Sequence, residues 1–194
     1  MEQALRFLID TTFGLFTYSF LARFMMQALR APFRNPVGPA VMALTDWAVK
    51  PTRRIVPGLR GVDWATLLLA FLSQWIWLLV LGFVATRAFV PAALPALALL
   101  AMVELVKAVI WILIIAVFLQ AILSWIAPDG PLSGLLNALT FRFLAPIRRK
   151  IPPLGGTLDL SPLIFIVIAQ LLLMLPVHWL EVLVAQTFRP ALAA

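Results

Sequence analysis

Residues 108–128 read AVIWILIIAVFLQAILSWIAP, a stretch without a single charged side chain. A helix needs about 20 predominantly apolar residues to cross the hydrocarbon core of a bilayer. Two further stretches, 64–86 and 160–180, are also free of charge and equally rich in Leu, Ile, Val, Phe and Trp. They lack the polar stripe that a helix of a soluble protein turns toward water. The three stretches therefore predict three transmembrane helices.

A fourth transmembrane helix is expected over about residues 5–29, although Asp10 and Arg23 interrupt it. Each of these two residues lies one or two turns from an end, where a side chain can reach the lipid headgroups. A cleaved signal peptide is the competing interpretation of this segment. Glu2 and Asp10 argue against it, because they spoil the basic leader that a signal peptide needs, and no small-residue cleavage site follows.

The composition agrees with a membrane protein and excludes most enzyme chemistry. Of 194 residues, 63% are hydrophobic and only 12% are charged, which is too little polar surface for a soluble globular domain. The chain has no cysteine and one histidine, His178, which excludes disulfides, iron–sulfur clusters, thiolate catalysis and Cys/His zinc sites. A haem or metal role for His178 would need a second ligand, such as its twin in a dimer. We expect a non-enzyme without metal or cofactor.

The basic residues predict the orientation of the chain. Ten Lys and Arg residues lie in the two long connections that follow the first and third helices, against three or four on the other side. By the positive-inside rule, both long loops lie in the cytoplasm and both termini lie outside it. The formal net charge of +7 is therefore directed at anionic lipid headgroups, and we expect no nucleic-acid partner.

The two long loops match each other at a spacing of 95 residues. Pro51-Thr52-Arg53-Arg54 falls on Pro146-Ile147-Arg148-Arg149 in this register. After one inserted residue, Asp63 meets Asp159 and Gln74 meets Gln170. A series of matches in the same order is typical of an internal repeat.

The repeat divides the chain into residues 1–95, with transmembrane helices at about 5–29 and 64–86, and residues 96–194, with helices at about 100–127 and 160–186. Each copy is a helix, a basic loop and a helix, so the two copies enter the membrane from the same side. Inverted-repeat transporters are built differently, which argues modestly against alternating access and leaves a channel open.

Each long loop is expected to contain a short amphipathic helix at the membrane interface. Asn35 and Pro36 supply a cap and a first helical residue, and Asp129 or Gly130 with Pro131 does the same in the second copy. Apolar residues recur on one face of each segment, namely Val37, Val41, Leu44 and Ala48, and Leu132, Leu136, Leu139 and Phe143. Such helices either cover the end of the bundle or bind a partner.

The second loop, 146–156, is the most distinctive stretch, because prolines stiffen it and three consecutive cations lie at the headgroup level. Anionic lipid contributes about 1 kcal/mol per cation in such a position. A docking surface for a membrane-protein partner is the alternative to a lipid anchor, and a homo-oligomer also remains open. The candidate contact residues of both loops are Pro51, Arg53, Arg54, Pro146, Arg148, Arg149, Lys150, Pro152, Gly155, Gly156 and Asp159.

Polar side chains inside the predicted membrane segments are the candidates for a path through the protein. Gln74 and Gln170 occupy matching positions in the two copies, and Ser124 lies near the end of the third helix. Hydrogen bonding between packed helices is the favoured interpretation, and pore lining is the alternative.

The second half of the chain carries a series of short motifs, namely Ala121-Ile122-Leu123-Ser124-Trp125-Ile126 with Pro128, Leu139-Thr140, Pro146-Ile147-Arg148-Arg149, Ile151-Pro152 and Gly155-Gly156 with Asp159-Leu160-Ser161-Pro162. With these motifs, the second half resembles the YggT family of bacterial and plastid membrane proteins. The first half resembles a degenerate copy that keeps Lys50-Pro51-Thr52-Arg53-Arg54 but has Arg60-Gly61 in place of the paired glycines.

This resemblance implies a multi-pass protein of the bacterial inner membrane without established catalytic activity. Members of the family are linked with osmotic tolerance and potassium uptake, with cell division and, in plastids, with cytochrome maturation. We therefore expect an assembly or organising factor whose basic loops meet lipid and a partner. Ion or osmolyte transport is the alternative function.

Overall fold

The structure is a computed structural model that describes residues 2–59, 61–151 and 159–187, and all regular elements in these ranges are helices. This confirms the predicted all-α fold class. The helices are α1 (Glu2–Ala28), α2 (Val37–Thr52), α3 (Trp64–Thr86), the short 3₁₀ turn η1 (Pro91–Ala93), α4 (Leu94–Ile126), α5 (Ser133–Lys150), α6 (Ser161–Leu172), the π-helical turn η2 (Leu173–Val177) and α7 (His178–Thr187).

Three of the described helical segments are long and apolar enough to cross a membrane. They are α3, η1 with α4 (Pro91–Ile126), and the continuous run of α6, η2 and α7 (Ser161–Thr187). All three overlap the predicted transmembrane ranges. The second segment begins earlier than the expected residue 100, because Pro91 and Pro95 lie in first helical turns, where a missing backbone N–H costs no hydrogen bond.

The sequence predicts four transmembrane helices, but only three of the described helical segments are apolar enough to cross a membrane. The predicted first span is helical throughout as α1, which has 27 residues. It falls short in apolarity because Asp10, Arg23 and several hydroxyl side chains lie among its apolar residues.

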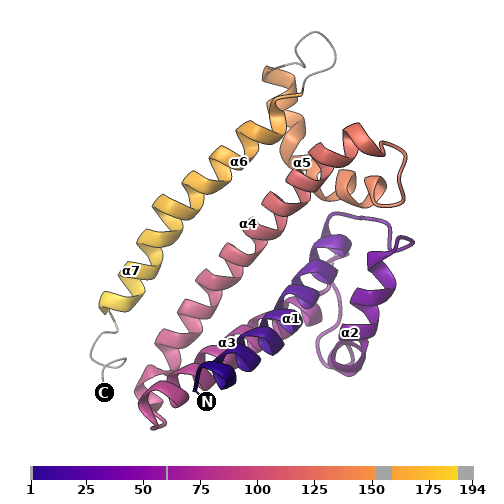
Figure 1. Ribbon diagram of the computed structural model, residues 1–194. Coiled ribbons are helices and arrows are strands. Elements are labelled where there is room, and N and C mark those ends of the chain that lie inside the picture. Colours follow the sequence, from indigo (N-terminus) through magenta and orange to yellow (C-terminus); the bar gives the residue numbers. More distant parts are fainter. Residues whose placement is uncertain (1, 60, 152–158, 188–194) are drawn as a thin grey trace.

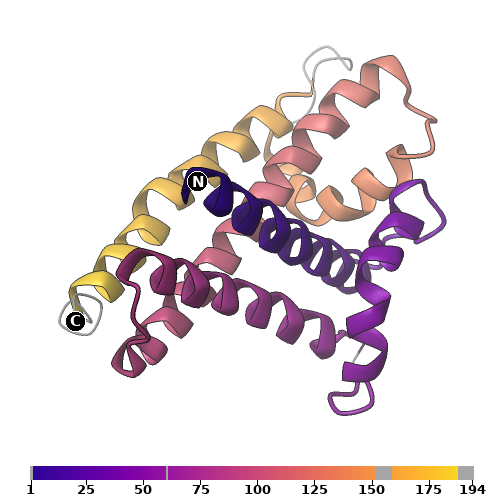
Figure 2. The ribbon, with the colours of Figure 1, turned by 60° about the horizontal axis from the view of Figure 1, so that its bottom comes forward.

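The first three helices form one packed unit. α1 lies alongside α3, and Figure 2 shows α2 crossing the ends of both helices. Asn35 caps α2, since its Oδ1 accepts the backbone N–H groups of Val37 at 2.8 Å and Gly38 at 3.0 Å. Gly38 permits the tight entry, because a Cβ there would lie 2.1 Å from the carbonyl oxygen of Phe33.

The remaining helices pack around α4, which contacts α1, α3, α5, α6 and α7. Figure 1 shows α2 and α5 toward the right of the molecule, while the turn between α3 and α4 lies at the lower left near the end of α7. α5 continues to Lys150, so the segment 146–150, expected as a loop, is helical. Pro146 lacks the N–H that would bond to the carbonyl of Arg142, and α5 continues past it for about one more turn.

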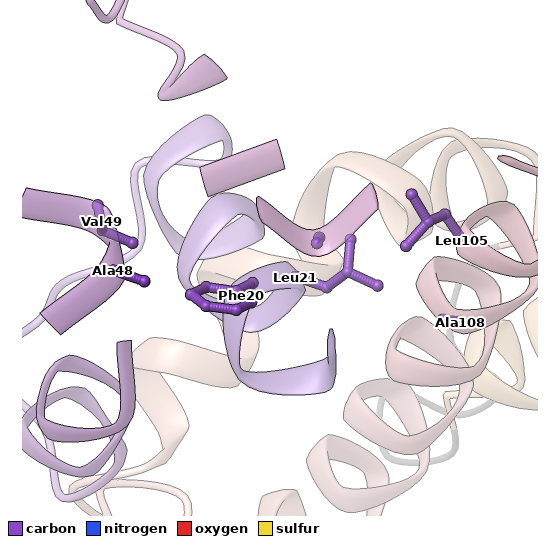
Figure 3. Packing of buried hydrophobic residues seen from close by; sticks show 7 residues of the cluster. Phe20, Leu21, Ala48, Val49, Leu105 and Ala108 are labelled. Carbon is purple, nitrogen blue, oxygen red and sulfur yellow. The ribbon is translucent and has the colours of Figure 1, made fainter. Parts of the chain in front are cut away.

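Two hydrophobic cores hold the helices together. In the first, Phe20 and Leu21 of α1 lie between Ala48 and Val49 of α2 on one side and α4 on the other (Figure 3). The second core joins the end of α1 to α4 and α5 through Met25, Met26, Ala31, Leu113, Leu135 and Leu139. Both cores therefore join the first half of the chain to helices of the second half.

Candidate functional site

Arg23 fixes α2 on α1. Its side chain is only 7% exposed, and Nη1 donates to Thr45 Oγ1 at 2.6 Å and to Asp46 Oδ1 at 2.7 Å. A buried guanidinium is costly unless it is paired in this way. Hydrogen bonds from Lys50 and then from Arg23 hold the pKa of Asp46 below its usual value. The sequence predicts that Arg23 extends to the lipid headgroups. In the structure its side chain is buried instead, because α2 brings hydrogen-bond partners to it.

Two arginine–aspartate pairs connect the ends of α2 and α5 to the helices that follow. Arg53, just after α2, donates through Nε to Asp63 Oδ2 at 3.0 Å, directly before α3. Arg148, in the last turns of α5, donates through Nε to Asp159 Oδ2 at 2.9 Å, directly before α6. Arg53 and Arg148 match in the 95-residue register, and Asp63 and Asp159 match after the one inserted residue.

The two aspartates are charged acceptors at helix starts. Burial opposes ionisation of Asp63, which is 1% exposed, but Arg53 and Thr66 outweigh it, so the pKa lies below its usual value. Burial likewise opposes ionisation of Asp159, and the Ser161 hydroxyl and backbone N–H, with Arg148, still lower its pKa. Asp159 Oδ1 accepts the backbone N–H of Ser161 at 2.9 Å, at the first residue of α6.

The candidate contact residues of the loops therefore have two different roles. Arg53 and Arg148 are committed to internal ion pairs. Arg54, Arg149 and Lys150 are exposed and form no ion pair with any residue that the structure describes. Pro51 and Pro146 lie inside α2 and α5, while Pro152, Gly155 and Gly156 lie outside the described residues.

A wide cleft of about 910 Å³ opens between the end of α1 and α5. Three of its lining residues are the cations Arg30, Arg142 and Arg149, and no residue of its described lining is acidic. Arg30 and Arg142 were not among the candidate site residues. Their place in the sequence gives no signal for this role, because the cleft forms only where α1 of the first half meets α5 of the second.

A smaller polar cavity of about 260 Å³ lies between α1, α3 and α4. Trp77 Nε1 donates to Asp10 Oδ1 at 2.8 Å, nine residues before the end of α3. Nine residues of helix rise about 13.5 Å, so the carboxylate of Asp10 faces the side of an apolar helix. The polar and aromatic residues that line this cavity are Asp10, Thr17, Tyr18, Gln74, Trp77, Glu104, Lys107 and Trp111.

The three intramembrane polar candidates are not brought together. Gln74 lines the cavity between α1, α3 and α4. Ser124 Oγ donates to the carbonyl of Ala121 at 2.7 Å and lies beside two other hollows near α5. Gln170 is in α6, and neither glutamine side chain has a hydrogen bond within residues 2–59, 61–151 and 159–187.

A cluster of charges joins α4 to α7. Lys107 Nζ lies 2.9 Å from Glu104 Oε1, one turn earlier in α4, and it also pairs with Glu181 of α7. His178 Nδ1 lies 3.5 Å from Glu181 Oε2 at the exposed side of the cluster. Across the part of the chain that the structure describes, no group of three or more His, Asp and Glu side chains is placed to bind a metal ion.

The long apolar helices, the charged residues paired between them and the basic end of the bundle define an all-helical membrane protein. The family model described as CCB3/YggT matches residues 2–84 and 99–180. The chain belongs to the CCB3/YggT family, as its resemblance implied.

Several bacterial relatives match most of the chain. The uncharacterized protein YggT of Escherichia coli K12 is 33% identical over 84% of this chain and 84% of its own length. An uncharacterized protein in the proC 3' region of Vibrio alginolyticus is 34% identical over 84% of this chain and 88% of its own. An uncharacterized Pseudomonas aeruginosa protein is 31% identical over 92% and 90%. No solved structure matches the chain significantly.

Proposed function

We propose that this protein is a non-catalytic organising factor of the bacterial inner membrane that recruits a membrane-protein partner to its basic face. The observation that carries the proposal is that neighbouring cations at the ends of α2 and α5 have different roles. Arg53 and Arg148 pair with the aspartates that precede α3 and α6, while Arg54, Arg149 and Lys150 are exposed. A rigid scaffold that displays uncompensated charge suits electrostatic recruitment of an acidic surface.

The proposal includes four transmembrane helices arranged as two parallel repeats, with α2 and α5 as amphipathic interfacial helices on the cytoplasmic side. Support comes from the two family-model matches, one in each half of the chain, and from the equivalent ion pairs at Arg53 and Arg148. Two observations support α1 as the fourth transmembrane helix. It packs along α3, and it exposes apolar side chains such as Phe7, Leu8 and Leu15.

Photocrosslinking tests the recruitment. A photoreactive residue at Ile151, which is 42% exposed beside Lys150, is activated in intact membranes, and captured proteins are identified by mass spectrometry. We expect an adduct that disappears in the R149E/K150E variant. Phe89, which is 63% exposed beyond the other end of α3, serves as the control position and should not give this adduct. An adduct that persists after charge reversal would contradict the proposal.

Transport is the second candidate, and the polar cavity between α1, α3 and α4 favours it. It costs free energy to place a carboxylate, a lysine and a glutamine beside apolar helices. Such groups in a membrane protein often mark the path of a solute. Purified protein in liposomes should then pass potassium or a small osmolyte, and the D10N variant should be slower, because the cavity loses a charge. Equal leakage from liposomes with and without the protein would rule this function out.

A further inference from the structure

The cleft between the end of α1 and α5 has the charge of an anion site. Arg30, Arg142 and Arg149 line it, together with the amide side chain of Asn137. None of the three arginines forms an ion pair or side-chain hydrogen bond with a described residue, whereas Arg23, Arg53 and Arg148 nearby are all paired. Unpaired arginines that share one hollow repel one another, so the cleft favours an anion that neutralises them.

The geometry of α5 explains why two of these arginines point to the cleft. Arg142 and Arg149 are seven residues apart, which is close to two helical turns, so they lie on one face about 10 Å apart along the axis. Phe141 and Ala145 line the same cleft. Arg148 lies about 100° around the helix from Arg149, and it pairs with Asp159 instead.

Arg30 reaches the cleft through an unusual backbone conformation. Its φ is 55°, in the left-handed region where glycine normally ends a helix. The N–H of the next residue, Ala31, donates to the carbonyl of Met26 at 2.7 Å and so closes the end of α1. An arginine in place of glycine costs stability here, and strained residues of this kind cluster at ligand sites.

The cleft has a fixed base rather than a mobile one. Met25 and Met26 at the end of α1 are buried against Leu135 and Leu139 of α5. This packing sets the distance between the backbones of Arg30 and of the two arginines of α5. The helices then need not rearrange on binding, which removes one part of the entropic cost.

We propose that this cleft binds a phosphate-bearing anionic group, as presented by the headgroup of an anionic phospholipid. Guanidinium groups bind phosphate oxygens in bidentate fashion. A volume of about 910 Å³ exceeds that of a bare phosphate, and the apolar side chains of Leu29 and Phe141 in the lining suit the glycerol and first acyl carbons of a lipid. This inference rests on the proposed function, because the cleft lies on the basic face described there. It adds an anionic lipid as a ligand of that face.

The experiment measures lipid binding to the purified full-length chain in uncharged detergent by native mass spectrometry. Phosphatidylglycerol is compared with phosphatidylcholine, and glycerol 3-phosphate is added as a soluble competitor. We expect phosphatidylglycerol adducts that phosphatidylcholine does not give. If glycerol 3-phosphate at a concentration equal to that of the lipid displaces the adduct fully, a soluble phosphate ester is the ligand, and the lipid assignment is overturned.

The variants R142Q and R30Q should each weaken phosphatidylglycerol binding about tenfold, the size expected for one charge-assisted contact. The R142K variant keeps the charge but not the bidentate geometry and should retain part of the affinity. R54Q is the matched control, because Arg54 is an exposed, unpaired arginine at the end of α2. An equal loss in R54Q and R142Q would overturn the cleft as a site. Helix content measured by circular dichroism identifies a variant that fails to fold. If R142Q fails to fold, the lipid affinity of R142K tests the site instead.

Lipid binding and partner recruitment are separable. R142Q and R30Q leave Arg149 and Lys150 in place, so capture from Ile151 should persist in both variants. Capture that persists in R142Q and R30Q while their phosphatidylglycerol adducts weaken would show that the two properties are independent, whereas R149E/K150E changes both, because Arg149 also lines the cleft. Absence of phosphatidylglycerol adducts from the wild type would overturn the inference and leave the recruitment proposal untouched.

Discussion

Arg148 Nε lies 2.9 Å from Asp159 Oδ2, whereas Arg149, the next residue, lines a cleft and pairs with no described side chain. Two adjacent arginines at the end of one helix therefore have opposite roles. One fixes the end of α5 to the start of α6, and the other faces outward. This division is repeated at Arg53, which binds Asp63, and Arg54, which is exposed.

R148Q should lower the thermal stability of the protein in detergent, while R149Q should leave it nearly unchanged. Arg148 and Asp159 are about one-third exposed, so the pair contributes only about 1 kcal/mol. For a chain of this length, that corresponds to a decrease in Tm of about 2–4 °C. Circular dichroism at 222 nm measures it. Equal shifts in both variants would show that the ion pair is not the cause.

Asp63 should give the protein a component of stability that disappears in acid. Its pKa lies below the ordinary value of about 4, because Arg53 and Thr66 stabilise the charged form despite burial. The contribution is complete above about pH 4 and is lost as the pH falls through the lowered pKa of the folded state. D63N should therefore be less stable than the wild type at pH 7, by about 2 kcal/mol. The difference should shrink toward pH 3 in thermal unfolding, and a gap independent of pH would contradict this assignment.

The K107M variant should be more damaging than removal of the whole charge cluster. Without Lys107, Glu104 and Glu181 face each other between apolar helices, which costs about 2–4 kcal/mol. The triple variant E104Q/K107M/E181Q removes the unpaired charges and should regain most of the loss. Thermal unfolding of the three proteins in one detergent gives the comparison. A triple variant as unstable as K107M would indicate that the cluster acts by packing.

The orientation predicts which positions react from outside the cell. The natural chain has no cysteine, so single cysteines need no altered background. Q3C and F89C should react with a membrane-impermeant maleimide on intact spheroplasts, whereas I55C should react only after lysis. Ile55 is 83% exposed and Phe89 63% exposed, so burial does not explain a missing reaction. Protection of Q3C together with I55C would show that α1 does not cross the membrane.

The sequence by itself determined the class of the protein and the approximate ranges of its three long apolar helical segments. Charge-free runs of about 20 residues have one stable arrangement in lipid, because only a helix satisfies all of its backbone hydrogen bonds within the segment. α3 occupies the predicted range 64–86, and Asn35 caps α2 as its sequence position indicates. These features are local, so residues close in the chain suffice to predict them.

Only the tertiary structure decided which charged residues hold the fold and which remain exposed. Arg148 and Arg149 are indistinguishable in sequence, and their roles differ because a residue-to-residue rotation of about 100° turns one toward Asp159 and the other toward α1. The cleft needs Arg30 from the first half beside Arg142 from the second, and the cavity at Asp10 needs three helices. Contacts between distant segments depend on how helices pack, and uniformly apolar helices carry no pattern that specifies their neighbours.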